Sequence, residues 1–398
     1  MEFMVYSKKF NNWLWNPSFW LPPNITWEDL KNKSANIYYP QYNDLWMSLL
    51  LAFCIIILRN IFEKFIAYPI GRKYGLKNNH QKLKTFNDDK EKLFKSTLKL
   101  NGHNANDRTI NDYINESEKN IRHPSNELKN GFYKSYQSSA LNDISNHTGL
   151  SQFKILKYLR QKHISSKNYS KLTKFSESFW RFTYYITAFF YGLTILYNKP
   201  WLWDTKYCWT DYPFQHVSRD IYWYYMIQMG FYCSLMVSQF MDVKRKDFWQ
   251  MFTHHVCTLL LMTFSWATNL VRIGTLVLVI HDAVDFWLEA TKITNYCKKP
   301  KLCNVIFCIF IVTWFLTRLV IFPYRVIYPA MFQAHKVLKT FFAAYYVYNS
   351  LLLLLLALNI FWFVIICKMA YKSIKYGEVK KDERSSSEDE TRQDAKNN

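Results

Sequence analysis

The sequence predicts an all-α integral membrane protein with about seven transmembrane helices. Half of its 398 residues are hydrophobic and 19% are aromatic. The mean hydropathy of −0.19 is nonetheless slightly negative, so polar and apolar residues must be segregated along the chain. Several uncharged apolar runs approach or exceed the roughly 18–20 residues that cross a bilayer as a helix. Six of the predicted spans lie within residues 175–370, where they are expected to form one bundle.

The chain begins with a polar and aromatic segment, residues 1–44, which carries two glycosylation sequons. Asn24 opens "NIT" and Asn32 opens "NKS". The first apolar run is short. We expect it to span the membrane as residues 45–62, with the side chain of Arg59 snorkelling to the interface.

A long basic loop follows the first span. Residues 71–175 contain 21 Lys/Arg and 9 Asp/Glu, so over half of the net charge of +21 lies here. A cytosolic loop that obeys the positive-inside rule explains this charge, and contact with anionic lipid or nucleic acid is the alternative. Residues 63–140 are expected to be basic and mostly disordered. In residues 141–170, apolar side chains at helical spacing flank "HTG", which predicts a small helix-turn-helix.

Six further apolar runs predict the remaining spans: residues 179–197, 221–241, 248–268, 271–290, 302–322 and 340–367. The linkers alternate in charge, since 242–247 and 298–301 are basic whereas 198–220 is nearly neutral. Seven spans and the positive-inside rule then place the N-terminus in the lumen and the C-terminus in the cytosol. Both sequons fall on the glycosylated side. The expected lumenal loop 323–339 disagrees with the rule because it carries basic residues.

The C-terminal segment, residues 371–398, is expected to be a disordered cytosolic tail. Its "ERSSSEDE" stretch places serines ahead of acidic residues, as acid-directed kinases require, so Ser385, Ser386 and Ser387 are phosphorylation candidates. An unmodified solvated tail is the alternative.

Two consecutive spans carry ionisable residues at matched depth. His254 lies seven residues after Asp247, and Asp285 lies seven residues before Lys292. At 1.5 Å per residue, both lie roughly 10 Å below the cytosolic surface. Sequential helices with a short connection usually pack as neighbours, so the two positions can face each other.

Neighbouring ionisable residues extend this candidate site. His255 lies about 100° around the helix from His254, so we expect one to contact substrate and the other to support it. His281 and Asp282 share a face with Asp285. Ionisable residues at this depth are costly and indicate a functional site. Interhelical hydrogen bonds without chemistry are the alternative.

A histidine and an aspartate in this arrangement favour acid–base or acyl-transfer chemistry. The aspartate orients the imidazole, and the histidine acts as a general base or as a nucleophile that carries an acyl group. Three histidines in the membrane region are too few for a di-metal site of the desaturase kind. The eight cysteines include no CxxC pair, so neither a disulfide framework nor a zinc site is expected. We expect no bound metal or cofactor.

The same residues carry a resemblance to a known family. "KRKDF", "HH", the "R-x-GTL" turn and "HDxxDxxLE" together closely resemble the ceramide synthase signature. Residues 175–370 look like this family throughout, including "SFWRFTYYITAFFYG", "NKPW", "YWYYMI" and "RLVIFP". The family comprises TLC-domain proteins of the endoplasmic reticulum membrane. They transfer a fatty acyl group from acyl-coenzyme A to the amine of a sphingoid base.

The resemblance implies roles and partners. His254 and Asp285 match the catalytic histidine and aspartate, and His255 and Asp282 match their motif neighbours. Acyl-coenzyme A would be the co-substrate, sphinganine or sphingosine the acceptor, and (dihydro)ceramide the product. Membrane lipids are further partners, and a homo- or heterodimer with other ceramide synthases stays open. The loop before the last span, here 324–339, influences acyl-chain length in the family.

Five further residues are expected to bind substrate: Lys244, Arg245, Lys246, Arg272 and His281. The first three are basic and can attract the phosphates of coenzyme A.

The helix-turn-helix segment resembles the truncated homeobox-like segment of many animal ceramide synthases. "GLSQFKILKYLRQKH" parallels a homeodomain recognition helix, but Tyr158 and Leu159 replace the usual Trp-Phe pair. Gln161 stands where the adenine-reading Asn would be. These departures argue against sequence-specific DNA binding and favour a vestigial or regulatory module. The main alternative for the whole chain is a non-catalytic TLC protein that binds lipid or assists translocation. The complete motif set favours the enzyme.

Overall fold

The computed structural model describes residues 13, 15–33, 36–76, 171–242, 247–338 and 342–376. Throughout these ranges the regular secondary structure is helical, with no strand. The chain divides into two compact units, and one of them comprises Met1–Leu76 and Lys174–Asn398. The account below concerns this unit. Several predicted features lie outside the described residues: the helix-turn-helix at 141–170, Lys244, Arg245, Lys246, Ser385, Ser386 and Ser387.

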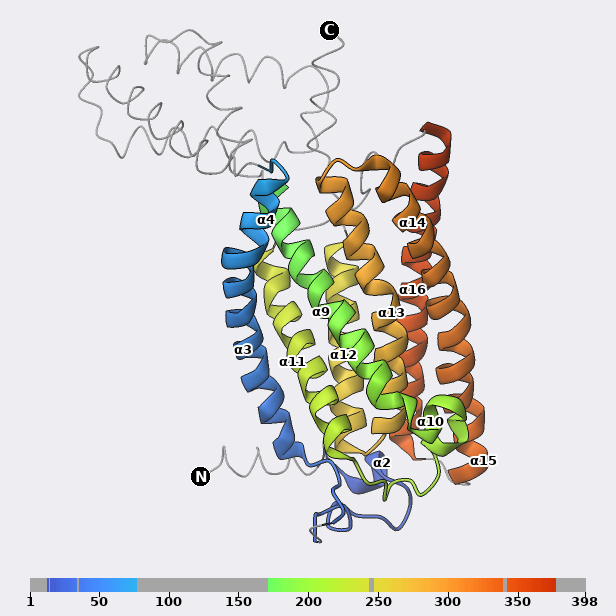
Figure 1. The fold of residues 1–398 in the computed structure, drawn as a ribbon. Helices are drawn as coiled ribbons and strands as arrows, with labels where there is room; N and C mark the ends of the chain where they lie inside the picture. The colour runs from blue at the N-terminus through green and yellow to red at the C-terminus, as the bar shows by residue number, and fades with distance from the viewer. Residues whose placement is uncertain are drawn as a thin grey trace, which may run out of the picture. The chain divides into compact units, whose positions relative to one another are not determined.

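The described residues contain seven long helical rods, which lie roughly side by side (Figure 1). Two rods consist of several successive elements. The first joins α3 to α4 through a π-helical turn, and the sixth joins α14 to α15 through three such turns. The bounds of the rods are: α3 Leu45–Phe62, η2 Glu63–Ala67 and α4 Tyr68–Lys73; α9 Lys171–Tyr197; α11 Arg219–Met241; α12 Phe248–Ala267; α13 Val271–Tyr296; α14 Pro300–Trp314, η5 Phe315–Ile321, η6 Pro323–Ile327, η7 Pro329–Gln333 and α15 Ala334–Leu338; α16 Ala343–Tyr376. Two short helices precede the first rod, α2 Pro17–Trp20 and η1 Tyr42–Asp44, and two lie between α9 and α11, α10 Pro200–Trp203 and η4 Thr205–Cys208.

Three of these rods are long and apolar enough to cross a membrane by length and composition: Tyr42–Lys73, Pro300–Val337 and Ala343–Lys375. The other rods carry buried polar side chains, such as Gln228 on α11 and Asp282 on α13. Polar residues of this kind lower the mean hydropathy of the other rods, although their lengths are similar to those of the three apolar rods.

The sixth rod differs from its prediction. Residues 323–339 were expected to form a loop, but the helix continues to Leu338. Pro323 and Pro329 lack an amide hydrogen and would normally interrupt an α-helix. Here each proline opens a π-helical turn, a wider form that locally replaces the α-helical hydrogen-bond pattern. Arg325 donates to the carbonyl groups of Leu202 and Trp203, which gives its charge a partner inside the fold.

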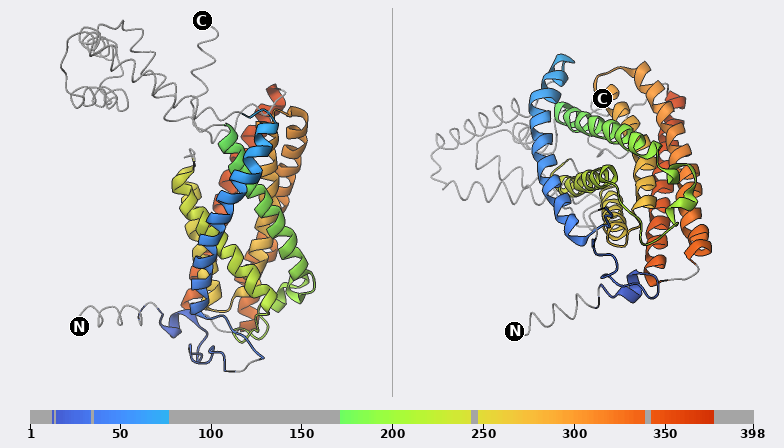
Figure 2. Two further views of the ribbon diagram at one scale, coloured as in Figure 1. Left: turned by 60° about the vertical axis from the view of Figure 1, so that its left-hand side comes forward. Right: turned by 60° about the horizontal axis from the view of Figure 1, so that its bottom comes forward.

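Residues 15–33 and 36–44 pack against the end of the bundle that lies away from α4 (Figure 2). The ring of Trp20 lies 4.6 Å from that of Phe264 on α12. Nε1 of Trp266 donates to the carbonyl of Gln41 at 3.1 Å and to the carboxylate of Asp44 at 3.2 Å. The N-terminal segment is therefore anchored to α12 at the point where this helix ends.

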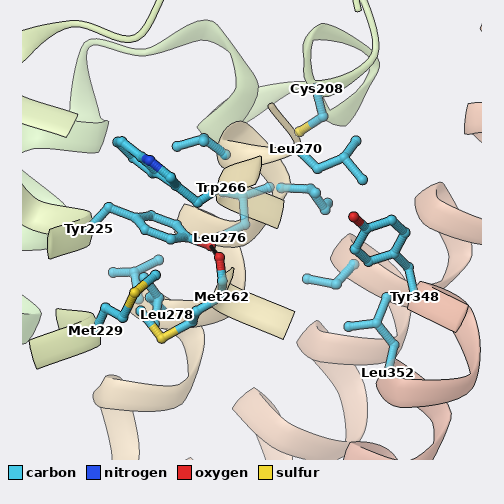
Figure 3. Packing of buried hydrophobic residues seen from close by; sticks show 14 of the residues in the cluster. Cys208, Tyr225, Met229, Met262, Trp266, Leu270, Leu276, Leu278, Tyr348 and Leu352 are labelled. Carbon is cyan, nitrogen blue, oxygen red and sulfur yellow. Dashed lines mark hydrogen bonds between the residues drawn. The ribbon is translucent and has the colours of Figure 1, made fainter. Parts of the chain in front are cut away.

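Part of the largest buried cluster lies near Trp266, and Figure 3 shows it from close by. Trp266 is fully buried, and its ring lies 5.3 Å from that of Tyr225 on α11. The Tyr225 hydroxyl forms a hydrogen bond with Ser265. Gly274 on α13 permits this approach, because a Cβ atom there would lie 2.6 Å from the Tyr225 hydroxyl oxygen. The cluster fixes α11, α12 and α13 against one another, and these helices also carry the candidate site.

Candidate active site

Three of the four candidate catalytic residues lie together in a cavity of about 140 Å³ between α9, α11, α12, α13, α14–η5 and α16. We call it the histidine cavity. Its lining consists of Arg181, Tyr185, Tyr232, Leu235, Gln239, Asp242, Phe248, Met251, His254, His255, Asp285, Leu288, Glu289, Lys292, Trp314, Arg318 and Trp362. The wall thus combines aromatic and aliphatic side chains with three cationic and three acidic groups. The structure brings His254, His255 and Asp285 to one place, as the matched depths predicted.

The two histidines present unpartnered nitrogen atoms. The Nδ1 atoms of His254 and His255 are buried and have no hydrogen-bond partner. Their ring centroids lie 5.6 Å apart, and the His254 ring meets the Trp362 ring edge-on at 5.4 Å. Nε1 of Trp362 donates to Asp247 at 3.1 Å, which fixes the start of α12 against α16. A buried nitrogen without a partner is costly and is suited to binding a ligand or carrying out chemistry.

Asp285 pairs with an arginine rather than with a histidine. Nη2 of Arg318 donates to Asp285 at 2.9 Å and to the backbone carbonyl of His281 at 2.9 Å. Nη1 donates to the amide oxygen of Asn359 at 3.2 Å, and the guanidinium lies 5.0 Å from the Trp314 ring centroid. Within the described part of the chain no hydrogen bond joins Asp285 to His254, although both line the same cavity.

Asp282 and His281 lie behind the cavity wall. Asp282 is fully buried and accepts a hydrogen bond from Nε2 of Gln228, whose Oε1 accepts one from Tyr184 at 2.9 Å. This chain of bonds links α13 to α11 and α9. His281 Nδ1 bonds to the Val277 carbonyl at 2.8 Å. Neither residue lines the histidine cavity, so both are placed to support it.

The cavity rim contains a charged cluster that joins three helices. Asp242 accepts from Arg181 of α9 at 2.6 Å and from Arg59 of α3 at 2.9 Å. Arg59 also pairs with Glu63 at 2.7 Å. The side chain of Arg59, which was predicted to snorkel to the interface, is thus held by two carboxylates.

Arg272 lies apart from the cavity. It precedes Asp285 by 13 residues on α13, a rise of about 20 Å. Its guanidinium donates to the Tyr207 carbonyl at 2.7 Å and lies 5.0 Å from the Trp201 ring. This differs from the predicted substrate contact, because Arg272 fastens α13 to the segment that contains α10 and η4.

The sequence analysis missed Arg318, and a signal for it was present. It is a single charged residue inside the apolar run 302–322, where an unpaired charge is very costly. Such a residue needs an acidic partner, and Asp285 was already a candidate inside a neighbouring span. Among the described residues, no group of three or more His, Cys, Asp and Glu side chains is arranged to hold a metal ion.

A second cavity of about 70 Å³ follows the histidine cavity along the same helices. We call it the apolar chamber. α12 lines the histidine cavity with residues 251–255 and the chamber with 258–265, and α13 and α16 also line both. The chamber wall consists of Trp209, Tyr225, Thr258, Leu261, Met262, Ser265, Leu270, Ile273, Gly274, Val277, Leu278, Ala330, Ala334, Phe342, Tyr345, Tyr348, Asn349, Leu352 and Leu355. Figure 3 shows several of these side chains.

Comparison with known proteins identifies the family. Residues 174–368 match the family model of the TLC domain. Ceramide synthase 5 of Mus musculus is 37% identical over 373 residues, which cover 94% of this chain and 81% of that protein. The chain belongs to the ceramide synthase family. Ceramide synthase 4 of Homo sapiens is 35% identical over 96% of this chain and 87% of its own length. Ceramide synthase hyl-1 of Caenorhabditis elegans is 42% identical over 55% of this chain and 62% of its own length.

The predicted resemblance to the ceramide synthases is thus confirmed. In this member of the family, the "HH" and "HDxxDxxLE" motifs lie on α12 and α13. His254, His255 and Asp285 line one cavity, and Asp282 lies behind it.

Proposed function

We infer that this chain is a ceramide synthase, an acyltransferase that moves a fatty acyl group from acyl-coenzyme A to the amine of a sphingoid base. The similarity to curated ceramide synthases over nearly the whole chain carries this conclusion. No bound cofactor is needed, because acyl-coenzyme A supplies the activated acyl group as a co-substrate.

We propose that His254 performs the chemistry in the histidine cavity. In one route, its unpartnered nitrogen removes a proton from the ammonium group, and the free amine attacks the thioester carbonyl. In the other route, the nitrogen takes the acyl group and releases coenzyme A as thiolate. The amine then attacks the acyl-imidazole and frees the histidine. In both routes the ammonium group gives up two protons as the amide bond forms. One proton goes to the thiolate, which leaves as the coenzyme A thiol, and the other passes through the histidine to solvent.

The surrounding residues have supporting roles in this proposal. Asp285 and Arg318 neutralise each other, so the cavity holds polar groups without a large net charge. Asp282 orients α13 through Gln228, and His255 lies beside His254 as a second nitrogen. Lys244, Arg245 and Lys246 remain candidates for the phosphates of coenzyme A.

The apolar chamber suits a hydrocarbon chain of one substrate. On α16 its lining extends from Tyr345 to Leu355, a rise of about 15 Å. This length accommodates most of a long acyl or sphingoid chain. The chamber starts one helical turn from His254, so a chain that enters it keeps its polar head near the reacting nitrogen.

We further propose that the seven rods are seven membrane spans in the endoplasmic reticulum, with a lumenal N-terminus and a cytosolic C-terminus. The sequon residue Asn24 is exposed in the N-terminal segment, at one end of the bundle. The histidine cavity lies toward the other end, near the α11–α12 connection. This arrangement would place the reaction within reach of cytosolic acyl-coenzyme A.

Microsomes that contain the full-length chain provide the test. Wild type is incubated with sphinganine and a series of acyl-coenzyme A donors, beside His254→Ala, Asp285→Asn and the exposed control Glu28→Gln. We expect N-acylated product with wild type and Glu28→Gln, and none with the two cavity variants at equal protein levels. Absence of product from wild type with every donor would contradict the proposed function.

A further inference from the structure

Two buried polar atoms in the wall of the apolar chamber have no hydrogen-bond partner. They are Oγ1 of Thr258 and Oδ1 of Asn349. The two residues are only 9% and 8% exposed. An unsatisfied polar group in an apolar wall costs free energy, so a wall that keeps two of them is suited to a polar ligand group.

The hydroxyl of Thr258 differs from those of other helical threonines in this protein. Thr183, Thr291 and Thr317 each donate to the carbonyl four residues earlier, at 2.8–2.9 Å. Thr258 makes no such bond to the carbonyl of His254. Its hydroxyl therefore keeps both a donor and an acceptor available to a ligand.

The amide of Asn349 is held in one orientation. Its Nδ2 donates to the carbonyl of Tyr345 at 2.9 Å. A flipped amide would bring two acceptor oxygens together, so this bond leaves Oδ1 as the atom available for a ligand. An oxygen in that position accepts a hydrogen bond from a hydroxyl group.

Helix register places both atoms near the reacting end of a bound lipid. The thiol of Cys257 contacts the Leu351 carbonyl at 3.3 Å, which sets α12 against the antiparallel α16. In this antiparallel register Asn349 lies well within one turn of Thr258 along the bundle, and Thr258 lies one turn, about 6 Å, from His254. A substrate oxygen a few carbon atoms from the reacting centre would meet this pair.

We propose that Thr258 and Asn349 bind a hydroxyl group that a lipid substrate carries close to its reacting end. The proposal rests on the proposed function. Two substrates supply this chemistry: an acyl chain hydroxylated next to its thioester, and a sphingoid base with an additional hydroxyl near its amine. The hydroxyl donates to Asn349 and accepts from Thr258, while the rest of the chain lies along the apolar wall.

The test compares substrate pairs in microsomes that contain the full-length chain. Each pair consists of a plain substrate and its hydroxylated form: an acyl-coenzyme A with its 2-hydroxyacyl counterpart, and sphinganine with 4-hydroxysphinganine. The readout is the ratio of kcat/KM for the hydroxylated form to that for the plain form. Thr258→Val and Asn349→Leu remove the polar atoms with little change in volume. Thr194→Val is the control, because its exposed hydroxyl donates to the carbonyl of Phe190.

We expect the ratio for one pair to fall about 5- to 10-fold in each chamber variant, as expected for one lost hydrogen bond. The pair that responds identifies which substrate carries the bound hydroxyl. Thr194→Val should leave both ratios unchanged, and Thr258→Ser should retain the wild-type ratio because it keeps the hydroxyl.

Unchanged ratios for both pairs in active chamber variants would overturn the inference and indicate that these atoms bind only water. Wild type that acylates no base at all would instead overturn the proposed function. The two failures are therefore distinguishable.

Discussion

Removal of the Arg318 charge is expected to destabilise the bundle strongly. In Arg318→Gln, the carboxylate of Asp285 loses its partner, and the carbonyl of His281 and the amide oxygen of Asn359 lose a donor. The charged side chains are 3% and 17% exposed, so water replaces little of the lost interaction. Breaking a buried ion pair from one side costs about 3–5 kcal/mol. That is a large share of the roughly 5–15 kcal/mol that stabilises a typical folded protein.

An exposed ion pair provides the matched control. Lys31 and Glu28 lie 2.6 Å apart, but their side chains are 58% and 70% exposed. Lys31→Gln should therefore cost at most about 1 kcal/mol. The double variant Arg318→Gln/Asp285→Asn leaves no unpaired charge, so its loss should be clearly smaller than the sum of the two single losses.

Thermal unfolding of the purified variants in one detergent measures these differences. The reasoning predicts a large drop in Tm for Arg318→Gln, a small one for Lys31→Gln, and partial recovery in the double variant. Unfolding of Arg318→Gln and Lys31→Gln at the same temperature would refute it. A loss of stability in the double variant equal to the sum of the losses in Arg318→Gln and Asp285→Asn would also refute it.

Three other experiments test separate features of the structure. His254→Ala should abolish acyl transfer yet change Tm by only a few degrees, because its Nδ1 has no partner to lose; a large drop in Tm would contradict this. Asn24→Gln should remove an endoglycosidase-sensitive mobility shift, whereas Asn32→Gln should leave it, because the Asn32 amide is bonded to neighbouring backbone. A shift lost only in Asn32→Gln would reverse the assignment. Gly274→Ala should lower stability by about 1–3 kcal/mol, because its Cβ would press on the Tyr225 hydroxyl; an unchanged Tm would show that the helices relax.

Much of the helical framework was predictable because apolar runs bounded by charges specify helices directly. The predicted first span, 45–62, coincides with α3, and the predicted 221–241 differs from α11 by two residues at its start. The continuation of the sixth rod through 323–338 was not predictable from local rules. Two prolines indicated a break there, and helix continuity depends on packing that no local pattern encodes.

The candidate site was predictable in its position but not in its bonding. Sequence spacing placed His254 and Asp285 at one depth, and the structure brings both to one cavity. The partner of Asp285 is Arg318, which lies on a helix distant in sequence. Choosing between a histidine and an arginine as that partner requires the three-dimensional arrangement of α13 and η5.

The central claim is that acyl transfer takes place at His254 in the histidine cavity. In the most direct measurement, purified protein is incubated with labelled acyl-coenzyme A and sphinganine. The labelled amide product and the released coenzyme A thiol are then quantified together. We predict equal amounts of the two from wild type and neither from a His254→Ala variant with wild-type Tm. Amide formation by that folded variant at the wild-type rate would contradict the claim.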